Sequence, residues 1–311
     1  MTIDLRARLE AAAPAARVER DAPLAPFTTF KVGGPADWLV RTQRADDVRR
    51  LVAVVREAGV PLVILGGGSN VLIADAGIRG VVIRIHGGDV VRLGPDRIRA
   101  DAGSTINGLV RWTINRGVSG LEMWAGTPGT VGGAIYGNAH FHGRLIGDLV
   151  DQVEIVTTDG TVEHIPASDM EFGYDRSRLQ RTGEIVLSAD FRCSEGEPSA
   201  LRTTARESLA YRKRTQPLEA SSAGCIFQNP DPRQDRVPEG IPASAGALVD
   251  RAGLKGHREG GARVSPTHGN FIVNDGQATA EEIRRLVERC RMNVEQRFGV
   301  TLRDEIVYLG F

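Results

Sequence analysis

A single thiol lies in residues 222–230, where Gly224 precedes Cys225 and Asn229-Pro230 closes the run. Glycine and Asn-Pro favour turns, so this segment can present the thiol to a pocket. A thiol with an ordinary pKa of about 8.5 carries its proton at neutral pH and can act as an acid. The same residues also fit a buried loop in which Cys225 is a small core side chain. The stretch alone leaves both interpretations open.

A first glycine-rich stretch, residues 66–70, reads Gly-Gly-Gly-Ser-Asn directly after the apolar residues 61–65. Glycine tolerates positive φ, so successive backbone N–H groups can converge on a phosphate, and the Ser and Asn side chains add donors. The stretch matches neither the G-x-G-x-x-G nor the P-loop pattern. A plain tight turn remains the alternative.

A second stretch, residues 126–138, holds five glycines in thirteen residues. A stretch with this much glycine loses an unusually large amount of backbone entropy on folding, and a plain loop does not require that loss. It lets the main chain lie against a flat or pyrophosphate-bearing ligand. Together the two stretches suit the two ends of a dinucleotide.

Composition excludes several classes of protein. The 39 Lys and Arg residues balance the 39 Asp and Glu residues, so no general field attracts nucleic acid or a membrane. Three cysteines do not form a disulfide framework, and the six histidines show no metal-ligand spacing. No apolar run reaches the roughly 18 residues of a membrane span. We therefore expect no metal, no nucleic acid or membrane partner, and a cytoplasmic location.

Local patterns predict the elements that must position these stretches. A β-α-β unit leads into the first stretch, with strands at 36–40 and 61–65 and a helix at 45–58. Short strands follow at 81–85, 90–93 and 97–101, and a helix at 105–115 leads into the second stretch. Asp159-Gly160 between β-branched runs predicts a hairpin of 153–156 with 161–165.

The remaining elements follow a polar break at 194–199. Helical spacing covers 201–214, and Thr279 with Glu282 forms a capping box for a last helix whose apolar stripe contains Cys290. An alternating strand over 300–309 carries Glu305.

Five motifs, in order along nearly the whole chain, resemble the UDP-N-acetylenolpyruvoylglucosamine reductases: residues 29–36, 66–70, 126–138, 224–230 and 269–274. The resemblance implies an FAD enzyme that NADPH reduces. It also implies reduction of UDP-N-acetylglucosamine enolpyruvate to UDP-N-acetylmuramate in peptidoglycan precursor synthesis. The short spacing between Tyr174 and the basic run at 211–217 fits the shorter, type II form.

The resemblance also implies an α+β fold. A two-part FAD-binding region of the vanillyl-alcohol-oxidase (PCMH) type would occupy residues 1–85 and 86–200. A C-terminal α/β substrate-binding domain would occupy residues 201–298, and residues 299–311 would return as a strand to the active site.

Site roles carry over residue by residue. Cys225 matches the family's proton donor, and Glu305 matches an acid that stabilises the enolic intermediate. The family's arginine is expected in a Tyr-Arg-x-Ser pattern, but this chain has Asp175 in that place and Arg176 one residue later. We therefore assign Arg176 to the substrate carboxylate, with Arg178 as an alternative.

Other residues are assigned to ligand binding. Tyr174 and Asn229 are expected to contact substrate, and Lys213 and Arg214 either face its pyrophosphate or form the charged end of a helix. The residues expected to hold FAD are Gly66, Gly67, Gly68, Ser69, Asn70, Gly126, Thr127, Pro128, Gly129, Thr130, Gly132, Gly133, Ala134, Tyr136 and Asn138.

Two other functions remain open. One is a different flavin oxidase or dehydrogenase of the same cofactor fold that acts on a sugar or alcohol. The other is a non-catalytic nucleotide-binding module, in which Cys225 is a core residue.

Overall fold

The computed structural model describes residues 5–311, whose contacts divide into two compact units. Unit 1 holds the described residues through Ala22, together with Ala36–Gly67 and Arg79–Ala210. Unit 2 holds Pro23–Pro35, Gly68–Ile78 and Tyr211–Phe311. The border at 210/211 falls inside α6 (Pro198–Thr215). The four contiguous domains expected from the sequence remain a prediction beside this division by contacts.

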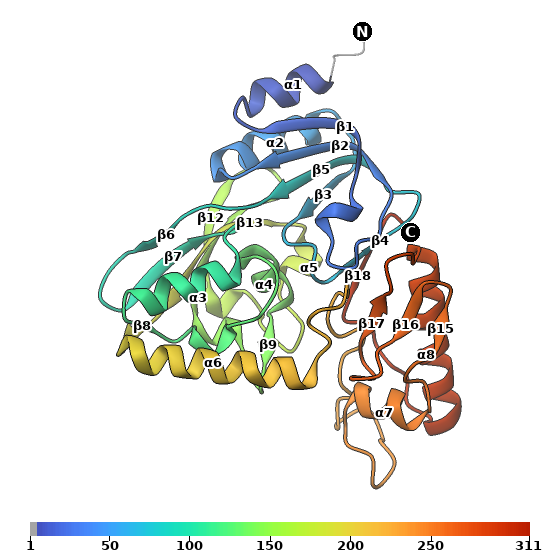
Figure 1. Ribbon diagram of the computed structural model, residues 1–311. Coiled ribbons are helices and arrows are strands. Elements are labelled where there is room, and N and C mark those ends of the chain that lie inside the picture. The colour runs from blue at the N-terminus through green and yellow to red at the C-terminus, as the bar shows by residue number, and fades with distance from the viewer. Residues whose placement is uncertain (1–4) are drawn as a thin grey trace. The chain divides into compact units, whose positions relative to one another are not determined.

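The first sheet of unit 1 has the strand order β1-β2-β5-β3 (Figure 1). It is formed by β1 (Arg17–Pro23), β2 (Pro35–Thr42), β3 (Leu62–Leu65) and β5 (Ile78–Ile85), with β3 and β5 parallel. α2 (Ala45–Glu57) buries the predicted stripe Val48, Leu51, Val52 and Val55, and α1 (Leu5–Ala12) adds Leu9 to the same core. The predicted β-α-β unit is confirmed, with β5 lying between its two strands.

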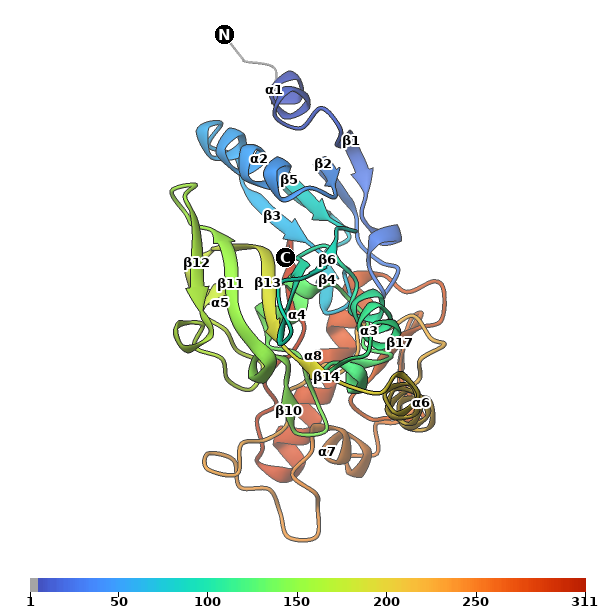
Figure 2. The ribbon, with the colours of Figure 1, turned by 90° about the vertical axis from the view of Figure 1, so that its left-hand side faces the viewer.

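The second sheet of unit 1 is antiparallel, in the order β12-β11-β13-β7-β6 (Figure 2). Its strands are β12 (Val162–Pro166), β11 (Val150–Val156), β13 (Ile185–Arg192), β7 (Arg97–Asp101) and β6 (Val90–Arg92). The predicted hairpin is confirmed, because β11 and β12 pair on either side of the Asp159-Gly160 turn. β13 is buried along almost its whole length.

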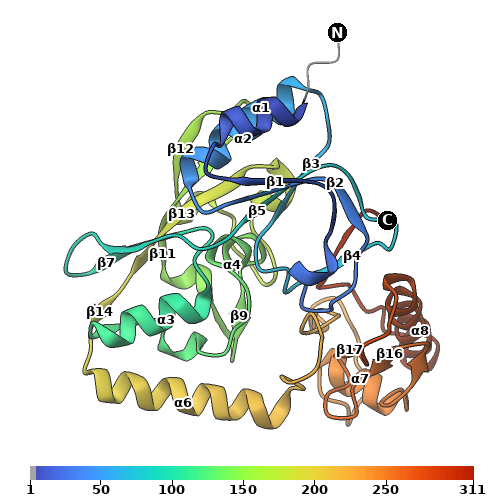
Figure 3. The same cartoon turned by 45° about the horizontal axis from the view of Figure 1, so that its top comes forward.

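Helices cover this sheet within unit 1 (Figure 3). α3 (Ile106–Asn115) begins where the Thr105 side chain accepts from Gly108 N, and α4 (Val131–Gly137) begins in the same way at Thr130. Both helices share a core with Trp124 and Phe191. Short elements complete the unit: β8 (Val118–Ser119), η2 (Glu122–Trp124), β9 (His140–Phe141), β10 (Arg144–Leu145), η3 (Ile146–Leu149), η4 (Ala167–Asp169), α5 (Leu179–Thr182) and β14 (Ser194–Glu195).

Unit 2 combines a small antiparallel sheet, β15-β16-β17, with two helices and the parallel pair β4 and β18. Its elements are η1 (Ala25–Phe27), β4 (Val71–Ile73), α7 (Ala245–Arg251), β15 (Arg258–Glu259), β16 (Ala262–Val264), β17 (Ile272–Asn274), α8 (Ala280–Phe298) and β18 (Val307–Leu309). The capping box at Thr279 and Glu282 is confirmed, and Cys290 is buried in the stripe of α8. Among residues 5–311, no helix is both long and apolar enough to cross a bilayer.

The predicted strand over 300–309 is wrong in extent, because only residues 307–309 form a strand. Val300, Leu302 and Ile306 are buried, which produces the alternating pattern. The backbone between them meets the loop around residue 227 through a single bridge, Phe227 with Asp304. Alternating burial therefore occurs here without a continuous ladder of hydrogen bonds.

Candidate functional site

The two glycine-rich stretches touch each other in unit 1. A Cβ atom added to Gly67 would lie 2.6 Å from Gly129 Cα, and one added to Gly66 would collide with the Thr130 hydroxyl. Glycine is therefore required at both positions for the two loops to pack together. We call these two packed loops, which come from two parts of the chain, the glycine cradle.

The second loop is held firmly by its neighbours. Gly129 O accepts from Ile106 N at 3.1 Å, and Gly126 N donates to Asn107 Oδ1 at 2.7 Å. The first residue of α4, Val131, donates its N–H to Ser104 O at 2.9 Å. Because α3 and the segment before it make these bonds, the loop has a fixed path. Pro128 and Gly133 remain exposed on it.

The contact division of the chain passes through the first stretch, so Gly68, Ser69 and Asn70 belong to unit 2. Gly68 has a φ of +62°, and a Cβ there would collide with Phe27 O. The Asn70 side chain donates to Glu305 O at 3.0 Å, and Asn70 O accepts from Val307 N at 2.9 Å. Asn70 therefore also holds the segment that carries the predicted acid Glu305.

Two residues that were predicted to bind FAD, Tyr136 and Asn138, lie at the end of α4. Asn138 is fully buried in the left-handed region, donates to Gly173 O at 2.7 Å and accepts from Gly147 N at 2.9 Å. Its amide thus ties α4 to a distant turn. Tyr136 is 37% exposed, and partial burial raises the pKa of its hydroxyl.

That turn, residues 173–176, contains Asp175 at the position where the family pattern has an arginine. Gly173 and Arg176 exchange both backbone hydrogen bonds, at 3.0 and 3.2 Å, so Tyr174 and Asp175 form its tip. Tyr174 and Arg176 are exposed, whereas the Asp175 side chain is 9% exposed. The Arg176 guanidinium lies against Gly173 of the same turn.

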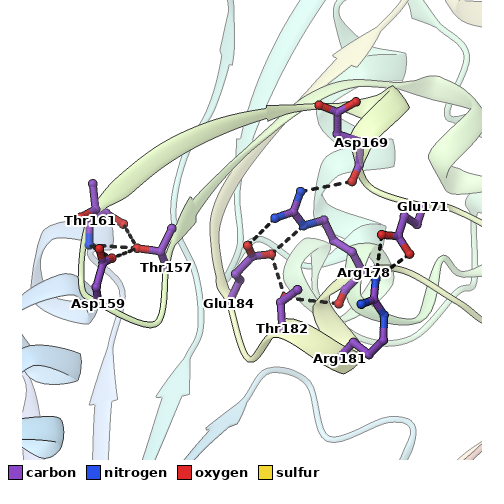
Figure 4. Close-up of polar contacts among 9 residues, drawn as sticks. All are labelled: Thr157, Asp159, Thr161, Asp169, Glu171, Arg178, Arg181, Thr182 and Glu184. Carbon is purple, nitrogen blue, oxygen red and sulfur yellow. Dashed lines mark hydrogen bonds and ion pairs between the residues drawn. The ribbon is translucent and has the colours of Figure 1, made fainter.

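Arg178, the alternative to Arg176, is engaged elsewhere in the same unit. Its guanidinium forms two hydrogen bonds with Glu184, at 2.7 and 3.0 Å, and another with Asp169 O at 3.3 Å (Figure 4). The hydrogen bonds to Glu184 raise its pKa. Because Glu184 satisfies its charge, Arg178 is a structural residue, and Arg176 remains the candidate.

In unit 2, the Cys225 loop is fixed by Asn270. Ile226 N donates to Asn270 O at 2.9 Å, and the Asn270 side chain accepts from Phe227 N and donates to Phe227 O, at 2.9 and 2.7 Å. Asn270 is 3% exposed. Cys225 itself is half-buried, and a backbone bridge joins it to Phe271. The thiol is therefore presented on a rigid loop and is not a fully enclosed core residue.

The two predicted acids, Cys225 and Glu305, lie on segments of this unit that are hydrogen-bonded to each other. Glu305 N donates to Ile226 O at 2.8 Å, and Gln228 N donates to Arg303 O at 2.8 Å. Glu305 is half-buried. Its neighbour Asp304 binds Arg291 through both carboxylate oxygens at 2.6 Å, which clamps the segment onto α8. The structure thus brings the Cys225 and Glu305 segments together.

The basic residues at the end of α6 lie on different sides of the helix, so some are exposed and one is buried. Lys213 and Arg214 are exposed, as a solvated or ligand-facing pair would be, whereas Arg212 is 6% exposed. Burial lowers the pKa of Arg212 to about 10, and the nearby Cys225 opposes that shift. The sequence analysis did not single out Arg212. The available signal was helical spacing, because successive residues of a helix point in different directions and Arg212 therefore faces another side than Lys213 and Arg214.

Asn229, the last predicted substrate contact, lies exposed at the end of the Cys225 loop. Its Oδ1 accepts from Ala245 N at 3.1 Å, at the start of α7. This bond fixes the path of the chain where it leaves the loop.

Two family models match the chain. Residues 36–166 match the FAD binding domain, and residues 216–309 match the C-terminal domain of UDP-N-acetylenolpyruvoylglucosamine reductase. The first match contains both glycine-rich stretches, and the second contains Cys225 and Glu305.

Whole proteins give the same result. The chain is 38% identical to UDP-N-acetylenolpyruvoylglucosamine reductase of Bacillus velezensis, over 94% of each chain, and 36% identical to that of Bacillus subtilis, again over 94% of each. The crystal structure of the Thermus caldophilus reductase (MurB) superposes with a TM-score of 0.78 at 35% identity, covering 94% of this chain and 99% of that one. The expected fold class, a PCMH-type FAD-binding region with a C-terminal α/β domain, is confirmed.

Proposed function

The chain belongs to the UDP-N-acetylenolpyruvoylglucosamine reductase family, and on that premise we propose that it reduces UDP-N-acetylglucosamine enolpyruvate to UDP-N-acetylmuramate. It is an FAD-dependent oxidoreductase of peptidoglycan precursor synthesis that uses NADPH. One observation carries the proposal: the loop of Cys225 and the segment of Glu305 are hydrogen-bonded to each other through Glu305 N and Ile226 O, at 2.8 Å. Family membership over 94% of the chain favours this reductase over an oxidase or a non-catalytic module.

The glycine cradle fits the cofactor. Gly66 and Gly67 allow the first loop to lie against the Thr130 hydroxyl and the Gly129 backbone with no side chain of its own at the contact, which suits a flat, pyrophosphate-bearing group. The residues of both stretches given above are the ones that would hold it. When bound, FAD accepts hydride from NADPH and supplies it to the enolpyruvyl double bond.

The protein must then supply a proton and stabilise charge. Hydride addition to the terminal carbon places negative charge on the carboxylate side of the substrate, and Cys225 delivers a proton to the neighbouring carbon. The half-buried thiol is held for this by Asn270. Once the proton has left, the buried positive charge of Arg212 stabilises the resulting thiolate.

Glu305 stabilises the enolic intermediate, and the Arg291–Asp304 clamp fixes its segment. Arg176 and Tyr174, exposed on their turn, serve the substrate carboxylate in this proposal. Lys213 and Arg214 provide positive charge for the substrate's pyrophosphate, and Asn229 provides a further polar contact.

The test separates flavin reduction from flavin reoxidation by rapid mixing. Cys225→Ala should leave reduction by NADPH unchanged and slow reoxidation by the enolpyruvyl substrate by about 100-fold or more, since a general acid typically contributes that much. Cys193→Ala is the matched control, because Cys193 is also a half-buried thiol and lies in unit 1. Equal reoxidation rates for the Cys225→Ala variant and the unaltered protein would exclude the thiol as proton donor.

A further inference from the structure

The turn at 173–176 carries an acid where the family pattern has an arginine. A lone carboxylate at Asp175 would repel the substrate carboxylate that the arginine is expected to bind. To bind this substrate, as the proposed function requires, the chain must compensate for that change with other residues.

The backbone holds Asp175 in an uncommon conformation. Its φ is +51°, in the left-handed region that glycine and asparagine favour at this place in a turn. Two bonds to the end of α4 fix the turn: Asn138 Nδ2 donates to Gly173 O at 2.7 Å, and the Ser177 hydroxyl donates to Tyr136 O at 2.6 Å. The position of Asp175 relative to the second glycine-rich stretch is therefore set by the fold.

Asp175 meets His140, two residues beyond that stretch. Its Oδ1 lies 2.9 Å from His140 Nδ1, and the two side chains are 9% and 24% exposed. The other carboxylate oxygen, Asp175 Oδ2, is buried with no hydrogen-bond partner. The Tyr174 ring packs on the imidazole with the ring centroids 4.6 Å apart. The carboxylate and the ring thus fix the imidazole from two sides.

A carboxylate that accepts from Nδ1 sets the orientation of the ring. An imidazole ring with a proton on both nitrogens carries a second N–H group, on Nε2, for an anionic ligand. We propose that His140 and Asp175 act together in place of the family's arginine: His140 donates from Nε2 to the substrate carboxylate, and Asp175 is its positioning residue. Arg176, on the same turn, adds a second positive charge to this subsite.

The test compares two ligands that differ only in the enolpyruvyl group. Calorimetric titration of the FAD-loaded protein, without NADPH, gives dissociation constants for UDP-N-acetylglucosamine enolpyruvate and for UDP-N-acetylglucosamine. His140→Gln should weaken binding of the first ligand by roughly 10- to 100-fold, as expected for a lost charged hydrogen bond. Binding of the second ligand should stay unchanged. Asp175→Asn should shift the same ratio in the same direction.

Glu171→Gln is the matched control. Glu171 lies on the same segment, has the same φ of +51° and pairs with Arg181 at the surface (Figure 4). It should change neither constant. Equal weakening of both ligands by His140→Gln, or no weakening of either, would overturn the inference while leaving the proposed function intact. If the unaltered protein bound neither ligand, the proposed function would fail and this inference with it.

Discussion

At the scale of single residues, the buried carboxylate of Asp190 contributes to the stability of unit 1. Arg99 donates to its two oxygens at 2.6 and 3.0 Å, and Gln152 donates at 2.8 Å. Burial alone would raise the pKa of Asp190, but these hydrogen bonds and the Arg99 charge outweigh it and lower the pKa. The carboxylate therefore stabilises the fold above its unfolded-state pKa of about 3.9, and this contribution is lost as the pH falls toward the folded-state pKa.

Asp190→Ala should lower the free energy of unfolding at pH 7 by about 2–3 kcal/mol, somewhat less than for fully buried pairs because solvent reaches Arg99. The difference from the unaltered protein should shrink below about pH 4. Urea unfolding followed by tryptophan fluorescence at both pH values measures it. Asp151→Ala, which removes a partly exposed pair with Arg97 in the same sheet, should change the free energy of unfolding by less than about 1 kcal/mol. A difference for Asp190→Ala that does not vary with pH would contradict this account.

Residue types revealed part of the site from sequence alone. The substitution at Asp175 is visible in its motif, but its partner His140 is not, since the two lie 35 residues apart in the chain and only the turn's anchoring to α4 brings them together. Arg212 was likewise hidden among other basic residues. Its burial depends on which side of α6 faces the protein, which the mixed composition of that helix does not indicate.

At the scale of elements, the contact between the two glycine-rich loops predicts a sharp difference between glycines. Gly67→Ala would place a methyl group 2.6 Å from Gly129 Cα and force the loops apart. We expect the purified variant to carry less than about a tenth of the normal flavin, measured by the ratio of visible to ultraviolet absorbance, since backbone strain of this kind involves several kcal/mol.

Gly137→Ala is the control for that prediction. A methyl group at Gly137 meets nothing within 4 Å, and the residue lies in α4. Flavin content should stay normal, and the melting temperature should stay the same or rise slightly, because alanine favours a helix. Normal flavin in the Gly67→Ala variant would show that the loops can separate without loss of the cradle.

Elements with strong local signals were predicted well, and those defined by distant partners were not. α2 and α8 follow from their apolar stripes, and α8 also from its capping box, which act within one helix. The segment 300–309 has the alternation of a strand, but its pairing depends on β4 and on the Phe227 loop, more than 70 residues away in the chain. Local pattern therefore gave the burial of Val300, Leu302 and Ile306 but overestimated the strand.

At the scale of the whole molecule, unit 2 depends on two early segments of the chain. Phe30, Val32 and Leu72 belong to its hydrophobic core, and β18 pairs with β4. Asp75 accepts from the first two N–H groups of α8, at 2.8 and 3.0 Å. Residues 216–309 match a named domain, but the hydrophobic core of unit 2 also includes these earlier residues.

A fragment of residues 211–311 should therefore fail to fold alone. It lacks three core side chains, the partner strand of β18 and one cap of α8. Each lost core side chain costs several kcal/mol, and the losses together exceed the stability of a typical domain. We expect an amide NMR spectrum with the narrow dispersion of an unfolded chain, against wide dispersion for the full chain under the same conditions. A well-dispersed spectrum with a cooperative thermal transition for the fragment would contradict this.

The interleaved connectivity also affects how the protein is made. The chain passes between the two units five times, so Phe30 and Leu72 leave the ribosome long before Val300 and Leu302, with which they share a core. At usual rates of translation the wait is on the order of ten to fifty seconds. During that interval these apolar side chains have no native neighbours from the C-terminal segment, so nascent-chain chaperones that bind short hydrophobic segments have a defined target around residues 30 and 72.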